Sequence, residues 1–184
     1  MNIRKMNIRK MLLPLMVVLA SSLILFGVSY GLQGLEKANR EKDRQYVMEH
    51  LLPGSKEFTE EAYEGEDANI VSVYKGSNGY VVETKVAGYA DDMTIMVGVD
   101  QDGAVLGLVV MDMAETFGLG QNALTDVDFL SQFLGNKGDV EIGSGIDALS
   151  GATVTSKAVA KAVNSASAFV TGADVSSGAT EWGN

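Results

Sequence analysis

The first long apolar stretch of the chain lies close to its N-terminus. No charged residue occurs from Met11 to Leu35, and about 20 apolar residues suffice for a helix to cross a bilayer. The stretch exceeds the roughly 7–15 residues of a signal-peptide core, and no Ala-x-Ala-like cleavage site follows it. We therefore predict a retained transmembrane helix at 11–35. The basic segment at 1–10 then forms a cytoplasmic tail, because positive flanks stay on that side.

Polar residues and then short apolar runs follow this stretch. Residues 36–68 indicate a helical and acidic connector, whose helix ends at Pro53-Gly54. Runs at 70–74 and 79–86 predict one hairpin, and runs at 92–99 and 104–110 predict a second. The second is the stronger prediction, because Asp102-Gly103 favours the positive φ that a tight turn needs. The strands alternate only loosely, so we expect one sheet face to pack on helices and the other to be free for a ligand.

Two helical patterns complete the predicted domain. A short helix at 126–133 has Asp126 or Thr125 as its cap and phenylalanines facing inward, and a glycine-punctuated loop with a short strand at 139–142 follows. A longer helix is indicated by apolar residues recurring at four-, three- and four-residue steps, namely Val159, Val163, Ala166 and Val170. The pattern therefore predicts an α+β domain at 69–172, an antiparallel sheet packed by helices, and a flexible tail at 173–184.

Composition narrows the chemistry that this domain can perform. The chain has no cysteine, so disulfides, thiolate metal sites and iron–sulfur ligation are excluded. A single histidine, His50, excludes a His-cluster metal site and a His-dependent triad. The net charge is −10, with four of the basic residues in the first ten positions, so we expect no nucleic-acid partner for the folded part. A cofactor would have to supply the chemistry.

The hydroxyl-rich turn that opens the long helix is the best candidate site. It reads Ser150-Gly151-Ala152-Thr153-Val154-Thr155. Backbone N–H groups at a helix start lack intrahelical partners and carry the positive end of the helix dipole, which suits a phosphate. Gly151 and Ala152 let a ligand approach the backbone, while the Ser and Thr side chains supply hydroxyls. The alternative is that these hydroxyls serve only as N-caps and bind nothing.

This hexapeptide resembles the flavinylation motif of the FMN-binding domain that occurs in the G subunit of Rnf complexes and in the C subunit of sodium-translocating NADH:quinone reductases. The resemblance implies that Thr155 forms a phosphoester with FMN, installed by a separate flavin transferase that uses FAD. It also implies that Ser150, Gly151, Ala152 and Thr153 contribute to the FMN site. A near-repeat at 177–182 has Trp182 in place of the acceptor threonine, so we do not expect a flavin there.

A second segment supports the same resemblance. The loop Glu115-Thr116-Phe117-Gly118-Leu119-Gly120 resembles the Glu-Thr-Pro-Gly-Leu-Gly loop of the family. It follows a Val-Gly-Val-Asp-x-x-Gly hairpin, which is present here at 97–103. The resemblance implies that Glu115, Thr116, Gly118 and Leu119 lie in the flavin pocket. The chain departs from the family in having Phe117 at the usual proline position and Met113 where histidine is common.

The resemblance implies a membrane-anchored electron-transfer subunit that carries covalent FMN in an Rnf-type ion-translocating ferredoxin:NAD⁺ oxidoreductase. The FMN domain would lie outside the cytoplasm, and the partners would be the other membrane subunits of the complex. The C subunit of a quinone reductase is one alternative. Another is a membrane-anchored sensor or adaptor that kept the fold without the flavin.

Overall fold

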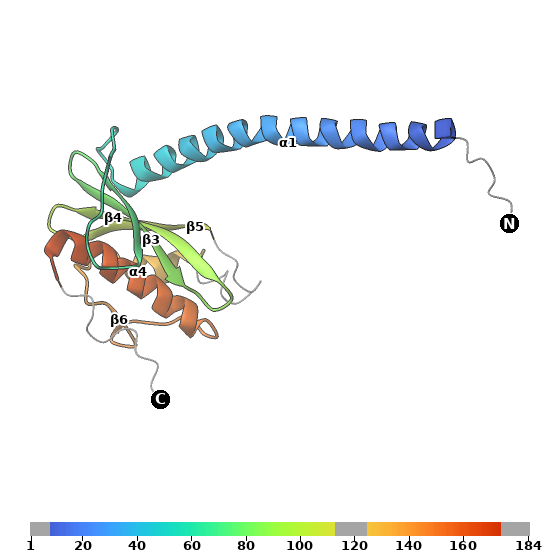
Figure 1. The fold of residues 1–184 in the computed structure, drawn as a ribbon. Helices are drawn as coiled ribbons and strands as arrows, with labels where there is room; N and C mark the ends of the chain where they lie inside the picture. Colours follow the sequence, from blue (N-terminus) through green and yellow to red (C-terminus); the bar gives the residue numbers. More distant parts are fainter. Residues whose placement is uncertain (1–7, 113–124, 174–184) are drawn as a thin grey trace. The chain divides into compact units, whose positions relative to one another are not determined.

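A computed structural model describes residues 8–112 and 125–173 of the chain (Figure 1). The chain divides into two compact units, Met1–Gln45 and Tyr46–Asn184. The expected cytoplasmic tail lies mostly outside the described residues, as do the flavin-loop residues 115–119 and all but the first residue of the expected C-terminal tail.

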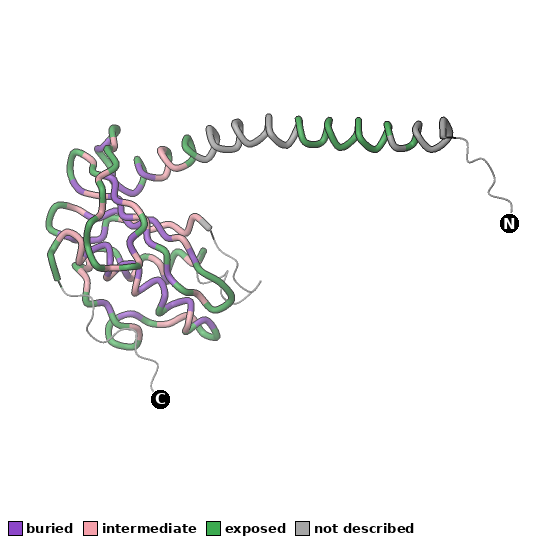
Figure 2. Tube along the Cα trace, in the orientation of Figure 1, coloured by how far each residue is buried: buried purple, intermediate pink, exposed green. Residues whose placement is uncertain are grey.

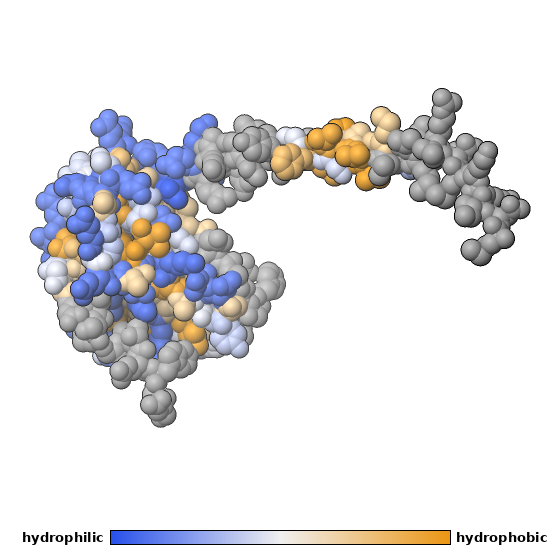
Figure 3. Space-filling view, in the orientation of Figure 1, coloured by the Kyte–Doolittle hydropathy of each residue, from blue (hydrophilic) through white to orange (hydrophobic). Residues whose placement is uncertain are grey.

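The described residues of the first unit form a helix that continues into the second unit. α1 spans Ile8–Leu51 and contains the charge-free stretch 11–35. The large apolar side chains described within this stretch are exposed, from 55% for Leu19 to 72% for Phe26, and this segment forms the orange part of α1 in Figure 3. Among the described residues, no helix combines the length and the apolar character that crossing a membrane demands.

The second unit is built on a five-stranded antiparallel sheet with the strand order β1-β2-β3-β4-β5. The strands are β1 (Thr59–Glu61), β2 (Ile70–Lys75), β3 (Gly79–Ala87), β4 (Asp92–Asp100) and β5 (Val105–Asp112). Both predicted hairpins are confirmed. Sequence analysis missed β1, because a three-residue strand within an acidic run carries no period-2 apolar signal.

One face of the sheet is covered by α4, which spans Thr153–Thr171. The predicted stripe is confirmed, since Val159, Val163 and Ala166 are fully buried, and α4 is largely purple and pink in Figure 2. The Phe169 ring lies 5.3 Å from the Tyr80 ring, at the start of β3. The C-terminal end of α4 therefore lies over the start of β3, and its N-terminal end points toward the opposite end of the sheet.

The other face of the sheet is covered by the last turn of α1. Met48, Leu51 and Leu52 are buried there with Tyr74, Val81 and Met96 of the sheet. Gly98 and Gly107 face each other across β4 and β5 directly below Leu51. The expectation of a free sheet face was therefore wrong. The apolar side chains of residues 46–52 cover the part of this face that contains Tyr74, Val81 and Met96.

The remaining elements lie between β5 and α4. α3 (Val127–Ser131) begins at Asp126, whose carboxylate accepts a hydrogen bond from the Phe129 N–H at 2.9 Å. The expected helix and its Asp126 cap are thus confirmed. Two short strands, β6 (Glu141–Ile142) and β7 (Gly145–Ile146), pair in parallel. Sequence analysis anticipated only the first of them.

Candidate functional site

The Ser150–Thr155 motif spans a turn and the first turn of α4. The Ala152 N–H donates to the Leu149 carbonyl oxygen at 2.9 Å, which closes a four-residue turn. Gly151 sits at the third position of this turn with φ of 79°, where residues other than glycine are strained. The helix begins at Thr153, so Thr153 and Thr155 belong to its first turn.

The start of α4 has no side-chain cap. Ala152 is the N-cap residue, and its methyl side chain makes no capping hydrogen bond. None of the hydroxyl residues of the motif therefore occupies the N-cap position. The N–H groups of Thr153 and Val154 have no intrahelical carbonyl partner, because they precede the first complete helical bond, from Ser156 to Ala152.

These features fit the phosphate end of FMN. Ser150, Gly151 and Thr153 are exposed, so donors around the helix start are open to an anion. The positive end of the helix dipole favours negative charge at the same place. The residues that would hold the phosphate group are thus Ser150, Gly151, Thr153 and the backbone of the first helical turn.

Thr155 itself is buried, with 1% of its surface exposed. It lies in the same helical stripe as Val159 and Val163, which face the sheet. A phosphoester at Thr155 Oγ1 would therefore require the segments over this hydroxyl to be displaced.

Ser156, the residue directly after the motif, holds the motif turn in place. Its hydroxyl donates to the Ala152 carbonyl oxygen at 2.9 Å and accepts from the Leu149 N–H at 3.3 Å. Ser156 is fully buried. It therefore ties the motif turn to the helix and offers nothing to a ligand.

Two amide side chains that sequence analysis did not identify hold the segment leading to this turn. Gln132 bonds the backbone of Asp147, and Asn164 of α4 bonds the backbone of Val140. The only local signal was an uncharged amide, Asn164, beside the apolar stripe of a helix. A sequence pattern does not show which distant backbone such an amide reaches.

The second half of the expected pocket lies outside the described residues, so Glu115, Thr116, Gly118 and Leu119 are not placed. The strand that leads to them is described. β5 ends at Asp112, which pairs with Thr94 near the start of β4. Since α4 starts toward the same end of the sheet, the chain leaves β5 on the side where Thr155 lies.

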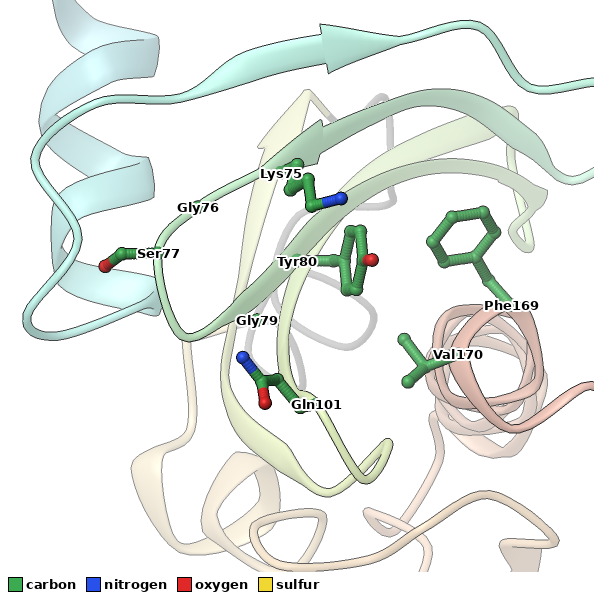
Figure 4. Close-up of a pocket in the computed structure, with 8 residues that line it drawn as sticks. All are labelled: Lys75, Gly76, Ser77, Gly79, Tyr80, Gln101, Phe169 and Val170. Carbon is green, nitrogen blue, oxygen red and sulfur yellow. The ribbon is translucent and has the colours of Figure 1, made fainter.

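A pocket of about 460 Å³ lies at the opposite end of α4 (Figure 4). Its walls include the Tyr80 and Phe169 rings and the Lys75 ammonium, which lies 5.7 Å from the centre of the Tyr80 ring. Lys75 is already paired with Glu61 at 3.3 Å. About 20 Å of helix separates Phe169 from Thr155 at about 1.5 Å per residue. This pocket is therefore separate from the phosphate site.

Comparison with known proteins agrees with the motif. Residues 88–168, which include Thr155, match the FMN-binding domain family. The G subunit of an ion-translocating oxidoreductase complex from Methanosarcina acetivorans is 28% identical over 179 residues, covering 89% of this chain and 95% of that protein.

Two further relatives match over part of their length. The G subunit of the Na⁺-translocating ferredoxin:NAD⁺ oxidoreductase complex of Acetobacterium woodii is 33% identical over 52% of this chain and 53% of that protein. The proton-translocating counterpart of Clostridium ljungdahlii is 38% identical over 50% of this chain and 53% of that protein. The chain thus spans about half the length of these two relatives. Together the matches confirm the resemblance found in the motifs.

Proposed function

We propose that this chain, which has an FMN-binding domain and resembles the G subunit of ion-translocating oxidoreductase complexes, is the electron-transfer subunit of an Rnf-type ferredoxin:NAD⁺ oxidoreductase. We further propose that it carries FMN covalently on Thr155. Its relatives support the assignment, since two of them are named as the G subunit of such oxidoreductases.

One observation carries the site assignment. The Ser-Gly-Ala-Thr-x-Thr motif lies at a helix start whose N-cap residue, Ala152, has no capping side chain, with Gly151 in the left-handed conformation. A helix start with open N–H groups binds phosphate through both hydrogen bonds and dipole. The motif thus brings a phosphate site and an acceptor hydroxyl, Thr155 Oγ1, into one helical turn.

Attachment of FMN by a flavin transferase is a phosphoryl transfer that needs no oxidant or reductant. The Thr155 oxygen forms a bond to the FMN phosphorus of FAD, the pyrophosphate bond breaks, and AMP leaves with the hydroxyl proton. The N–H groups of Thr153 and Val154, at the start of α4, would donate hydrogen bonds to the anionic phosphate. Since Thr155 is buried, the segments that cover its hydroxyl must be displaced before the transferase can reach it.

Once bound, the flavin supplies the electron-transfer chemistry that these side chains lack. The phosphoester leaves the isoalloxazine ring unattached, so the ring is available to partner centres. A covalent bond also prevents loss of the cofactor by dissociation, which mass action would otherwise drive in dilute surroundings. The protein is therefore an electron relay within a larger complex.

We also propose that residues 11–35 anchor the chain in the cell membrane as a single span, with residues 1–10 in the cytoplasm and the FMN domain outside it. The stretch lacks charges, and its described apolar side chains are exposed on all sides of α1, as a lipid-facing helix requires. The partners are then the other membrane subunits. Because the chain has no cysteine, Glu57→Cys would report the side of the membrane through an impermeant maleimide. Labelling only after cell lysis would refute the topology.

The deciding experiment is the intact mass of the protein purified from its own membranes, with a peptide map. We expect a mass gain of one FMN less one water on the peptide that contains Thr155, and none in Thr155→Val. An unmodified protein in cells with an active flavin transferase would refute the proposal. It would then favour the adaptor without flavin.

A further inference from the structure

Two side-chain amides hold the segment that leads into the motif. The Val140 N–H donates to Asn164 Oδ1 at 2.8 Å, and Asn164 Nδ2 donates to the Val140 carbonyl oxygen at 3.0 Å. The Asp147 N–H donates to Gln132 Oε1 at 2.8 Å, and Gln132 Nε2 donates to the Asp147 carbonyl oxygen at 3.5 Å. A primary amide has both a donor and an acceptor. Each side chain can therefore bond both the N–H and the C=O of one residue, as a neighbouring β-strand would.

We call these two pairs of hydrogen bonds the Asn164 clamp and the Gln132 clamp. The segment between them has few other contacts that hold it in place. β6 and β7 have two residues each, and Gly143 and Gly145 both have positive φ. Only Val140 and Ile146 in this segment are buried. Without its side-chain clamps the segment would gain backbone freedom, since few packing contacts oppose it.

The Gln132 clamp lies closest to the motif. Asp147 is two residues before Leu149, whose N–H bonds Ser156 and whose carbonyl closes the turn onto Ala152. The order along the chain is therefore clamp, turn and helix start. Release of the clamp would free the entry of the turn while the helix stays packed against the sheet.

We propose that Gln132 is a positioning residue for flavin attachment: by clamping Asp147 it holds the turn in the conformation that presents the phosphate site, Ser150, Gly151 and Thr153, to FAD while the cover over Thr155 is displaced. This inference rests on the proposed function at Thr155. Preorganised geometry raises reaction rates because misplacement by about 1 Å can cost up to about 10²-fold.

The test uses the full chain in detergent, made without a flavin transferase and then incubated with a purified transferase and FAD. The initial rate of mass gain is followed by intact mass spectrometry. Gln132→Leu removes both hydrogen bonds to Asp147, whereas Gln132→Glu keeps the acceptor for the 2.8 Å bond. Ser55→Ala is the stability control, because it removes the acceptor of the Ser77 N–H in the β2–β3 turn, at the other end of the sheet.

We expect Gln132→Leu to attach FMN about 10-fold more slowly than the wild type, on the scale of misplacement effects, with Gln132→Glu close to the wild-type rate. Ser55→Ala should retain the wild-type rate despite its lower melting temperature. Hydrogen exchange of peptide 147–155 should be faster in Gln132→Leu and unchanged in Ser55→Ala.

Each contrary result has a distinct meaning. If the wild type gains FMN and Gln132→Leu keeps its rate or exceeds it, the positioning role is refuted while the proposed function stands. A Gln132→Glu variant as slow as Gln132→Leu would also refute it. If the wild type gains no FMN, the proposed function fails and the inference fails with it.

Discussion

The contact between Leu51 and Gly98 gives the sharpest stability prediction. A Cβ placed on Gly98 would overlap the backbone carbonyl of Leu51, whereas a Cβ on Gly107 would lie 3.2 Å from the tip of the Leu51 side chain. The two glycines pair directly across β4 and β5. Gly98→Ala and Gly107→Ala are therefore a matched pair that differs in what the new methyl group meets, a fixed backbone or a flexible side chain.

The expected costs follow from this difference. Overpacking of a core costs about 1–3 kcal/mol, and lifting the end of α1 would partly expose Leu51 and Leu52, each worth about 1.5–3 kcal/mol when fully buried. Replacing glycine by alanine stabilises the folded state by about 0.4–1 kcal/mol, because it lowers the conformational entropy of the unfolded chain. We therefore expect Gly98→Ala to lose about 2–4 kcal/mol, and Gly107→Ala to stay within about 1 kcal/mol of the wild type.

Calorimetric unfolding of the full chain in detergent would measure both variants. At about 4 °C per kcal/mol for a domain of this size, Gly98→Ala should melt about 8–16 °C below the wild type and Gly107→Ala within about 4 °C of it. Equal melting temperatures for the two variants would show that the end of α1 does not rest on this face, and the reasoning would be refuted.

Three further predictions concern other parts of the molecule. Thr155→Ser should still accept FMN, because it retains the hydroxyl, and intact mass would detect the added group; a variant without flavin would mean that the methyl group is also required. Asp126→Ala should destabilise the domain by about 1 kcal/mol through loss of the cap to Phe129, measured by urea unfolding, with no change in midpoint as the contrary result. The hydrogen bond and charge of Glu61 raise the pKa of Lys75 above its ordinary 10.5, so this pair's contribution to stability is fully present below pH 10.5 and is lost as the pH rises through the folded-state pKa. Glu61→Gln should lower the pKa of Lys75, observed by NMR titration of its side chain, and an unchanged pKa would remove Glu61 as the cause.

Some features of the candidate site depend on neighbouring residues in the sequence, and others depend on residues that are distant along the chain. The residues of the Ser150–Thr155 motif and the helix behind it were evident from sequence, because glycine, hydroxyls and an apolar stripe act within a few neighbouring residues. The sequence did not show which of the hydroxyl groups are exposed and which are buried. Thr153 is exposed while Thr155 and Ser156 are buried, because neighbouring positions of a helix point to different sides, and only one side of α4 faces the core.

The sequence by itself determined both hairpins, the short capped helix and α4, because their signals are turn residues and apolar periods within a single segment. Only the tertiary structure decided that the last turn of α1 covers the second face of the sheet, and that Gln132 and Asn164 hold the backbones of Asp147 and Val140. These contacts join residues distant along the chain. Which residues become partners depends on which surfaces meet once the sheet has formed. A local pattern of residues does not contain this information.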